Sequence, residues 1–168
     1  MASNSTTDEN FAISARAFCT LIERLDSLSE WEFIIASAER LAALYQSGLL
    51  LSLRMVDACL SDHNVEGISM DHWQELYEEL GEKLTKKGLY WEVFDPCKKT
   101  EPLIASLADD LAGIYGDVKA GLISYEAGHV SEAVCHWRES FLIHWGSHAV
   151  DALCYLHRII ATRVMEDL

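Results

Sequence analysis

Residues 103–127 read LIASLADDLAGIYGDVKAGLISYEA, and this stretch decides the fold. Its large apolar side chains recur every three or four positions, which is the spacing of one face of an α-helix. These side chains are Leu103, Leu107, Leu111, Ile114, Val118 and Leu122. Thr100 is a good N-cap, Pro102 suits a first turn, and Gly128 suits the stop. We therefore predict a long helix that begins near Thr100 and ends at about residue 127.

The same periodicity resumes after Ser131 and continues to the end of the chain. The positions that carry it are Val134, Trp137, Phe141, Trp145, His148, Ala152, Leu156 and Ile159. Gly146 interrupts this run, and we expect it to bend the helix. Because only a short turn at Gly128 separates the two long helices, we expect them to pack antiparallel.

The N-terminal half contains two capping boxes, in which a Ser or Thr precedes a Glu by three residues. Thr6 with Glu9 predicts the start of a first helix, so residues 1–7 are expected to be a disordered tail. Ser29 with Glu32 predicts the start of a second helix, which Gly48 would end as a left-handed cap.

The middle of the chain is less regular. Residues 49–60 are apolar without a clear period, so the sequence does not determine whether they are helical. A third amphipathic helix is expected over about residues 71–87, with Gly88 closing it. The aromatic segment 90–96 ends in Pro96, which disfavours a helix there, and we interpret it as a packed connector or an unpaired strand.

Composition agrees with a helical class. The chain has 168 residues, 50% of them hydrophobic, and its two prolines leave the helices largely uninterrupted. That length suits one domain. We predict an all-α protein in which residues 8–168 form a single up-and-down bundle of about five or six helices.

Charge and cysteine usage indicate the partners and the compartment. The formal net charge of −14 disfavours nucleic acid and anionic membranes as partners. Five scattered Cys and the lack of a leader-like N-terminus predict reduced thiols in the cytoplasm. The longest apolar run is far shorter than a membrane span.

Polar residues lie at the edge of the apolar faces of the two long helices. Helical geometry puts Asp110 and Asp117 together on one edge of the first. On the second, His148 lies near the centre of the apolar stripe, and His144 and Asp151 share one edge. Antiparallel packing would bring these five side chains into a shared seam.

Two interpretations of this cluster are open. We favour a structural one, in which carboxylates and imidazoles hydrogen-bond to each other and replace the water that burial removes. The alternative is a divalent metal site, since inward-facing carboxylates and imidazoles bind iron, manganese or zinc in helical bundles. Its ligands would come from Asp110, Asp117, His144, His148 and Asp151.

A second alternative is a helical ribonuclease. Arg138 followed by His144 resembles the Arg and His spacing of helical ribonucleases in bacterial toxins and defence proteins. The two side chains are roughly 120° apart on a helix, and the acidic composition disfavours RNA. The competing interpretation is that Arg138 pairs with a nearby carboxylate.

Several longer motifs resemble one known family. They are the segment 90–96, Leu107 to Leu111 with Ile114, Tyr115 and Asp117, Trp137-Arg138 with Phe141, and His144-Trp145-Gly146 with His148, residues 151–153 and His157. The chain is similar here to a bacterial family of uncharacterised helical proteins, domain of unknown function 5063. The resemblance implies a helical fold and supplies no activity or site residues.

From these observations we expect a non-catalytic interaction or adaptor protein with an unknown protein partner, and the sequence leaves open whether it is an enzyme. No cofactor is expected unless the Asp and His cluster binds a divalent metal. Matching faces on the helical pair favour a homodimer.

Overall fold

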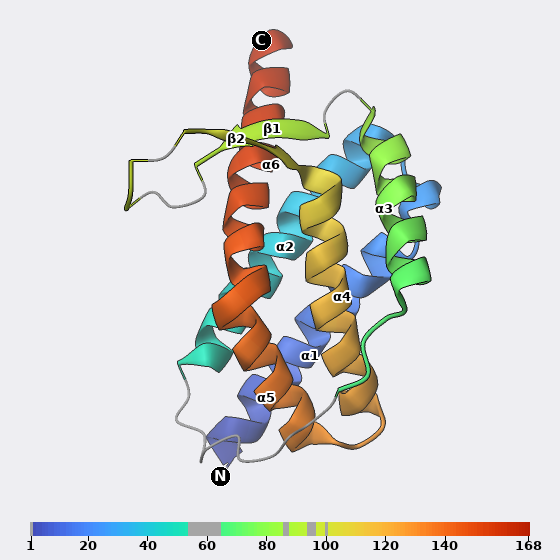
Figure 1. The fold of residues 1–168 in the computed structure, drawn as a ribbon, viewed down its shortest axis with the longest axis vertical. Coiled ribbons are helices and arrows are strands. Elements are labelled where there is room, and N and C mark those ends of the chain that lie inside the picture. Colours follow the sequence, from blue (N-terminus) through green and yellow to red (C-terminus); the bar gives the residue numbers. More distant parts are fainter. Residues whose placement is uncertain (1, 54–64, 86–87, 94–96, 100) are drawn as a thin grey trace.

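The computed structural model of the chain is an all-α bundle in which the first five helices alternate in direction and the sixth continues the fifth (Figure 1). It describes residues 2–53, 65–85, 88–93, 97–99 and 101–168. The elements are α1 (Ala2–Ile22), a 3-10 turn (Leu25–Ser27), α2 (Glu30–Ser52), α3 (Met70–Leu84), β1 (Leu89–Glu92), β2 (Leu103–Ser106), α4 (Leu107–Glu126), α5 (Val130–Ser140), a π-helical segment (Phe141–Trp145) and α6 (Gly146–Glu166). The prediction of an all-α, up-and-down bundle is confirmed.

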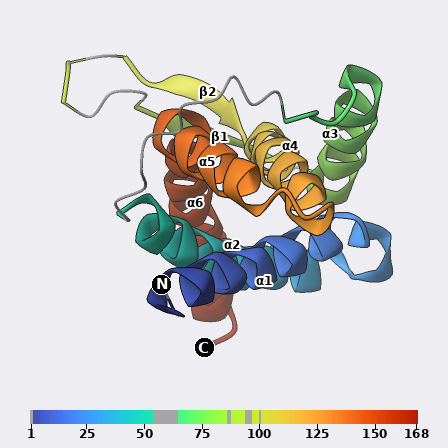
Figure 2. The ribbon, with the colours of Figure 1, turned by 90° about the horizontal axis from the view of Figure 1, so that it is seen from below.

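The helices form layers that can be followed from below (Figure 2). α1 and α2 lie side by side and cover one side of α4, α5 and α6, and a two-stranded hairpin lies across the other side. α3 packs against α4 at one edge. The buried apolar side chains of these helices form one core cluster, in which Trp137, Trp145 and Phe11 are among the largest.

The second helix begins where the sequence predicts. The Ser29 hydroxyl accepts from the Glu32 backbone N–H, and the Glu32 carboxylate accepts from the Ser29 N–H. Its end was predicted wrongly, because α2 continues through Gly48 to Ser52. Gly48 packs under the Trp145 ring, where an added Cβ would lie 2.7 Å from that ring. Residues 49–52 are therefore helical, and 54–60 lie outside the described residues.

The starts of two further helices also differ from the prediction. α1 begins at Ala2, so the capping box at Thr6 does not start it and the helix includes most of the segment that was expected to be a tail. α4 begins at Leu107, with the Ser106 hydroxyl accepting from the Asp109 N–H as its N-cap. Thr100 lies outside the described residues. Propensity near a helix end leaves several start sites open, and tertiary contacts select one.

The segment preceding α4 forms a hairpin that periodicity did not reveal. β1 and β2 pair antiparallel, with Trp91 opposite Ile104 and Glu92 opposite Leu103. Leu103 is therefore in a strand instead of the first helical turn, and the strand expected to be unpaired has a partner. A strand's partner cannot be read from its own sequence when the partner also fits a helical pattern.

The long C-terminal run contains a π turn instead of a simple bend. Residues Phe141–Trp145 are π-helical, and the Gly146 N–H donates to the carbonyl of Phe141, five residues earlier. A Cβ at Gly146 would lie 2.3 Å from that carbonyl oxygen, so only glycine fits without a backbone shift. As predicted, α4 and α5 join through a turn at Gly128, which has φ +91°.

Cysteine chemistry departs from the expectation at one position. Cys19 and Cys154 are free thiols, whereas Cys135 is disulfide-bonded. Over the described residues, no helix has the length and apolarity to cross a membrane.

We predict that Gly146→Ala lowers the free energy of unfolding by about 1–3 kcal/mol, because the added methyl group overpacks the π turn. Urea unfolding followed by circular dichroism measures this change. Gly81→Ala is the matched control, since a Cβ there meets nothing within 4 Å and helix propensity should raise stability by about 0.5–1 kcal/mol. Equal changes in the free energy of unfolding for the two variants would contradict the close packing of Gly146 in the π turn.

Candidate functional site

A buried carboxylate joins three elements at the centre of the candidate site. Asp110 on α4 is only 3% exposed. Its Oδ2 accepts from the Tyr90 hydroxyl of β1 at 2.7 Å, and its Oδ1 lies 2.8 Å from Nδ1 of His148 on α6. An ionised carboxylate can only accept, so Nδ1 of His148 carries the proton and donates it. Asp110 thus ties the hairpin to both long helices.

A second pair of the same kind lies two turns along α4. Asp117 Oδ2 is 2.8 Å from Nδ1 of His144, which is at the end of the π turn. The two imidazole rings touch edge to face, with centroids 4.8 Å apart. We call these two carboxylate and imidazole pairs the seam, which consists of Asp110, Asp117, His144 and His148.

Asp110 shifts the pKa values of the two groups that donate to it. The hydrogen bond to Asp110 raises the pKa of His148 despite the opposing effect of burial. Burial, together with the Asp110 carboxylate, raises the pKa of the Tyr90 hydroxyl, so this phenol stays neutral and acts as a donor. The Tyr90 hydroxyl and His148 Nδ1 therefore both act as hydrogen-bond donors to Asp110.

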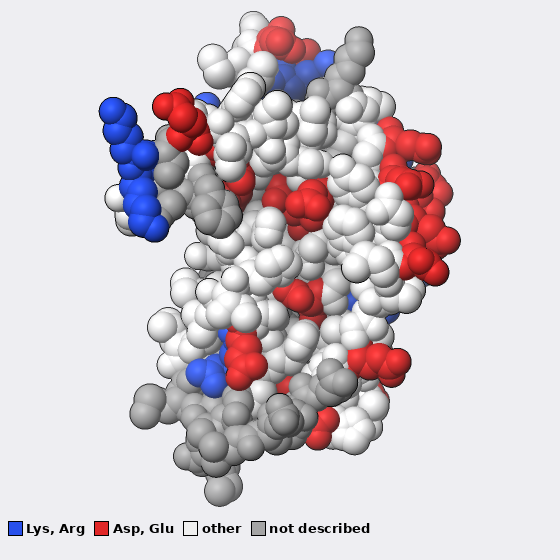
Figure 3. Space-filling view, in the orientation of Figure 1, with Lys and Arg blue, Asp and Glu red and all other residues white. Residues whose placement is uncertain are grey.

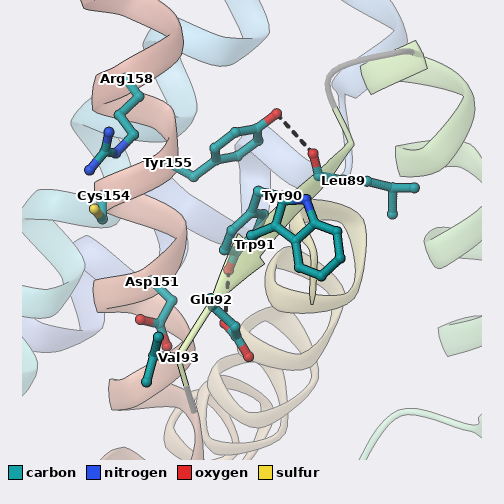
Figure 4. A pocket seen from close by; sticks show the side chains of 9 residues that line it. All are labelled: Leu89, Tyr90, Trp91, Glu92, Val93, Asp151, Cys154, Tyr155 and Arg158. Atoms are coloured by element: carbon teal, nitrogen blue, oxygen red, sulfur yellow. Dashed lines mark hydrogen bonds between the residues drawn. The ribbon is translucent and has the colours of Figure 1, made fainter. Parts of the chain in front are cut away.

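A groove of about 510 Å³ lies beside the seam, between β1 and α6 (Figure 4). It is lined by Leu89, Tyr90, Trp91, Glu92, Val93, Asp151, Cys154, Tyr155 and Arg158. The Tyr90 and Tyr155 rings stack at 4.6 Å, and the Tyr155 hydroxyl donates to the Leu89 carbonyl at 3.2 Å. These contacts hold the strand against the helix and leave the groove open alongside them.

Two carboxylates in the groove have raised pKa values. For Glu92 the causes are burial first, then the charges of Asp151 and Asp110. For Asp151 they are burial and then Asp110. Arg158 lines the same groove but is toward its other end (Figure 4), and across the described part of the chain no ion pair joins it to either acid. The groove therefore has an acidic end, where His148 and the Tyr90 hydroxyl offset only part of the effect of burial and neighbouring charge on Glu92.

Most of the predicted cluster is assembled, in an arrangement that only the fold specifies. Asp110, Asp117, His144 and His148 form the seam, and Asp151 lies in the groove, close enough for its charge to interact with His148. Arg138 is held elsewhere. Its Nη2 donates to the Ser52 carbonyl on α2, whereas His144 is held by α4. The geometry supplies no support for a ribonuclease pair.

Sequence reasoning missed the contribution of Tyr90, Glu92 and Tyr155. Hydrophobicity gave no signal for it. Residues 89–92 alternate between exposed and half-buried in the structure, but the exposed positions are Leu89 and Trp91 and one half-buried position is Glu92. That period of two is typical of a strand with one face on the protein.

The five-residue metal site is not present as a unit. Within the ranges that the structure describes, no three His, Cys, Asp or Glu side chains are placed to hold a metal ion together. Asp110 and Asp117 instead accept hydrogen bonds from the histidines that were their proposed fellow ligands.

The fold and the seam define the chain as an all-α bundle protein with carboxylate-oriented histidines. A family model described as "Domain of unknown function (DUF5063)" matches residues 2–162, so the chain belongs to this family, as the sequence motifs predict. The chain is similar to the crystal structure of protein BF1032 from the bacterium Bacteroides fragilis, with a TM-score of 0.76 and 23% identity over 89% of each chain. That likeness shows the shared fold. No curated protein matches the sequence.

We predict that Tyr90→Phe lowers the free energy of unfolding by about 1–3 kcal/mol, because Asp110 is buried and loses one of its two donors. Tyr155→Phe is the control, since it removes a hydrogen bond to a neutral carbonyl and should cost about 0.5–1.5 kcal/mol. Urea unfolding of both variants decides whether the buried carboxylate depends on its phenol donor.

We also predict that Asp151→Asn lowers the pKa of Glu92 toward its ordinary value, because a neighbouring negative charge is removed while burial remains. Carbon NMR of the Glu92 carboxyl group follows this titration. Asp109→Asn serves as the control, because Asp109 acts on His148 and is not among the causes of the Glu92 shift. An unchanged Glu92 titration in Asp151→Asn would show that the two acids are not coupled.

Proposed function

We propose that this protein is a non-catalytic interaction protein that binds an extended, basic segment of a partner protein in the groove between β1 and α6. The observation that carries this proposal is an open strand edge that lies beside an acidic, aromatic-lined groove. Three features support it: the edge, the exposed side chains and the charge.

The outer edge of β1 faces the groove. The Leu107 N–H donates to the Gly88 carbonyl, and antiparallel ladders alternate, so the backbone groups of residues 90 and 92 face β2. Those of Leu89 and Trp91 then face outward. The Tyr155 hydroxyl reaches the Leu89 carbonyl from α6, which supports this placement. Trp91 would therefore present its N–H and carbonyl to an added strand, the mode known as β-augmentation.

The hairpin also exposes large apolar side chains. Trp91 is 69% exposed and its cross-strand neighbour Ile104 is 64% exposed, with Leu89 and Leu103 beside them. Contiguous exposed apolar groups on a soluble domain are typical of interaction sites, and Trp is enriched where binding energy concentrates.

Charge indicates the chemistry of the partner. Burial and the charges of Asp151 and Asp110 raise the pKa of Glu92, so a cationic side chain placed beside these carboxylates would relieve that cost. Exposed acids also gather over α3 on one edge of the face in Figure 3. This acidity supports a basic protein segment as partner in preference to nucleic acid or anionic lipid. We infer a cytoplasmic setting from the free thiols of Cys19 and Cys154. The disulfide at Cys135 is the observation that argues for an oxidising compartment instead.

Selection from a phage library of random linear peptides on the full chain tests the proposal. We expect enriched peptides that alternate apolar residues with Lys or Arg. Their binding should weaken about tenfold in Asp151→Asn, which corresponds to roughly 1.4 kcal/mol, and should be unaffected by Glu78→Gln on the distant acidic face of α3. A selected peptide can be N-methylated at its odd-numbered or at its even-numbered backbone amides. Only the set whose N–H groups pair with β1 should abolish binding when methylated.

Two outcomes would overturn the proposal. One is that no peptide is enriched, or that enriched peptides bind Asp151→Asn and a Trp91→Ser variant as well as they bind the native chain. The other is that the chain sediments as a dimer which Trp91→Ser dissociates, because a second copy would then occupy this surface.

A further inference from the structure

The two histidines of the seam have an arrangement that the proposed groove function does not use. His144 and His148 are one helical turn apart, and their side chains are 49% and 32% exposed. The Nδ1 of each is occupied by a carboxylate from α4. The Nε2 of each makes no hydrogen bond to any other described residue, so both second nitrogens are available to a ligand.

The carboxylates determine which nitrogen is available. Because Asp117 and Asp110 accept from Nδ1, the proton of each neutral ring is on Nδ1 and the lone pair is on Nε2. A metal-bound histidine in proteins almost always donates its other ring nitrogen to a carboxylate or carbonyl in this way, which orients the ring and increases its basicity. Here that supporting arrangement exists on two adjacent rings.

We propose that His144 and His148 bind one transition-metal ion through their Nε2 atoms, with Asp117 and Asp110 as positioning residues. Imidazole suits Zn²⁺, Ni²⁺ and Cu²⁺ among the divalent ions. Since the described residues supply no third protein ligand, water completes the coordination, and the site is an open one.

The spacing of the rings fits one shared ion. With metal to nitrogen distances of about 2.0–2.1 Å and a near-tetrahedral angle, the two imidazole centres would be roughly 5 Å apart. The observed separation of the ring centroids is 4.8 Å. The separation of the rings is thus the one that a shared ion requires. Because they meet edge to face at an interplanar angle of 72°, the rings must turn for both Nε2 lone pairs to point at the ion.

The π turn contributes to this geometry. It ends at Trp145, so His144 lies within it and His148 lies in the first turn of α6, and both face α4. π turns inside helices occur frequently at functional sites.

Calorimetric titration of the untagged full chain with Zn²⁺ at mildly alkaline pH tests the site, together with nitrogen NMR of the histidine rings. We expect one ion per chain and a shift at the Nε2 atoms of His144 and His148. Affinity should fall at least tenfold in His144→Ala, whose exposed side chain can be removed with little effect on packing. His157→Ala, at an exposed histidine of α6 outside the proposed site, is the matched control and should bind as the native chain does.

A separate variant tests whether Asp117 positions His144 for metal binding. Asp117→Asn should weaken Zn²⁺ binding by about 10–100-fold while both Nε2 atoms still respond at high metal concentration. The proposal is overturned if no ion binds, if His157→Ala weakens binding as much as His144→Ala, or if binding depends on Cys97 or Cys154 and not on the histidines. None of these results bears on peptide binding in the groove, so the two proposals fail separately.

Discussion

A single buried charge organises the functional side of this protein. The Asp110 carboxylate lies in the core region, where an ionised group is costly unless hydrogen bonds replace its lost water. It meets that requirement with a phenol from β1 and an imidazole from α6, each on a separate oxygen. Because both donors come from other elements, Asp110 sets where the hairpin and the last helix lie relative to α4.

Close contacts between tryptophan and glycine hold the helices that carry the seam. An added Cβ at Gly121 would lie 2.2 Å from the Trp137 ring, and the Nε1 of Trp137 donates to the Val118 carbonyl of the same helix, α4. Trp145 packs against Gly48 of α2 in the same manner. These contacts let α5 and the π turn approach their neighbours closely. The result is a rigid base from which His144 and His148 project.

The seam and the groove lie side by side but differ in chemistry. The histidines of the seam are hydrogen-bonded at Nδ1 and accessible at Nε2. The groove instead combines the outer edge of β1 with the carboxylates of Glu92 and Asp151. Tyr90 connects them, since it donates to Asp110 and stacks on Tyr155. Occupation of the groove would therefore act directly on a donor of the seam.

The sequence by itself determined the helical class, the Ser29 capping box, the stop at Gly128 and the pairing of the two long helices, because each follows from periodicity or from local hydrogen bonds. It also placed Asp110, Asp117, His144 and His148 near one boundary, since helical geometry sorts residues by face. Only the tertiary structure decided which carboxylate meets which histidine, that Gly48 continues a helix, and that residues 89–92 pair with 103–106. Those outcomes depend on contacts between segments far apart in the chain, where a buried carboxylate or a tryptophan ring overrides local propensity.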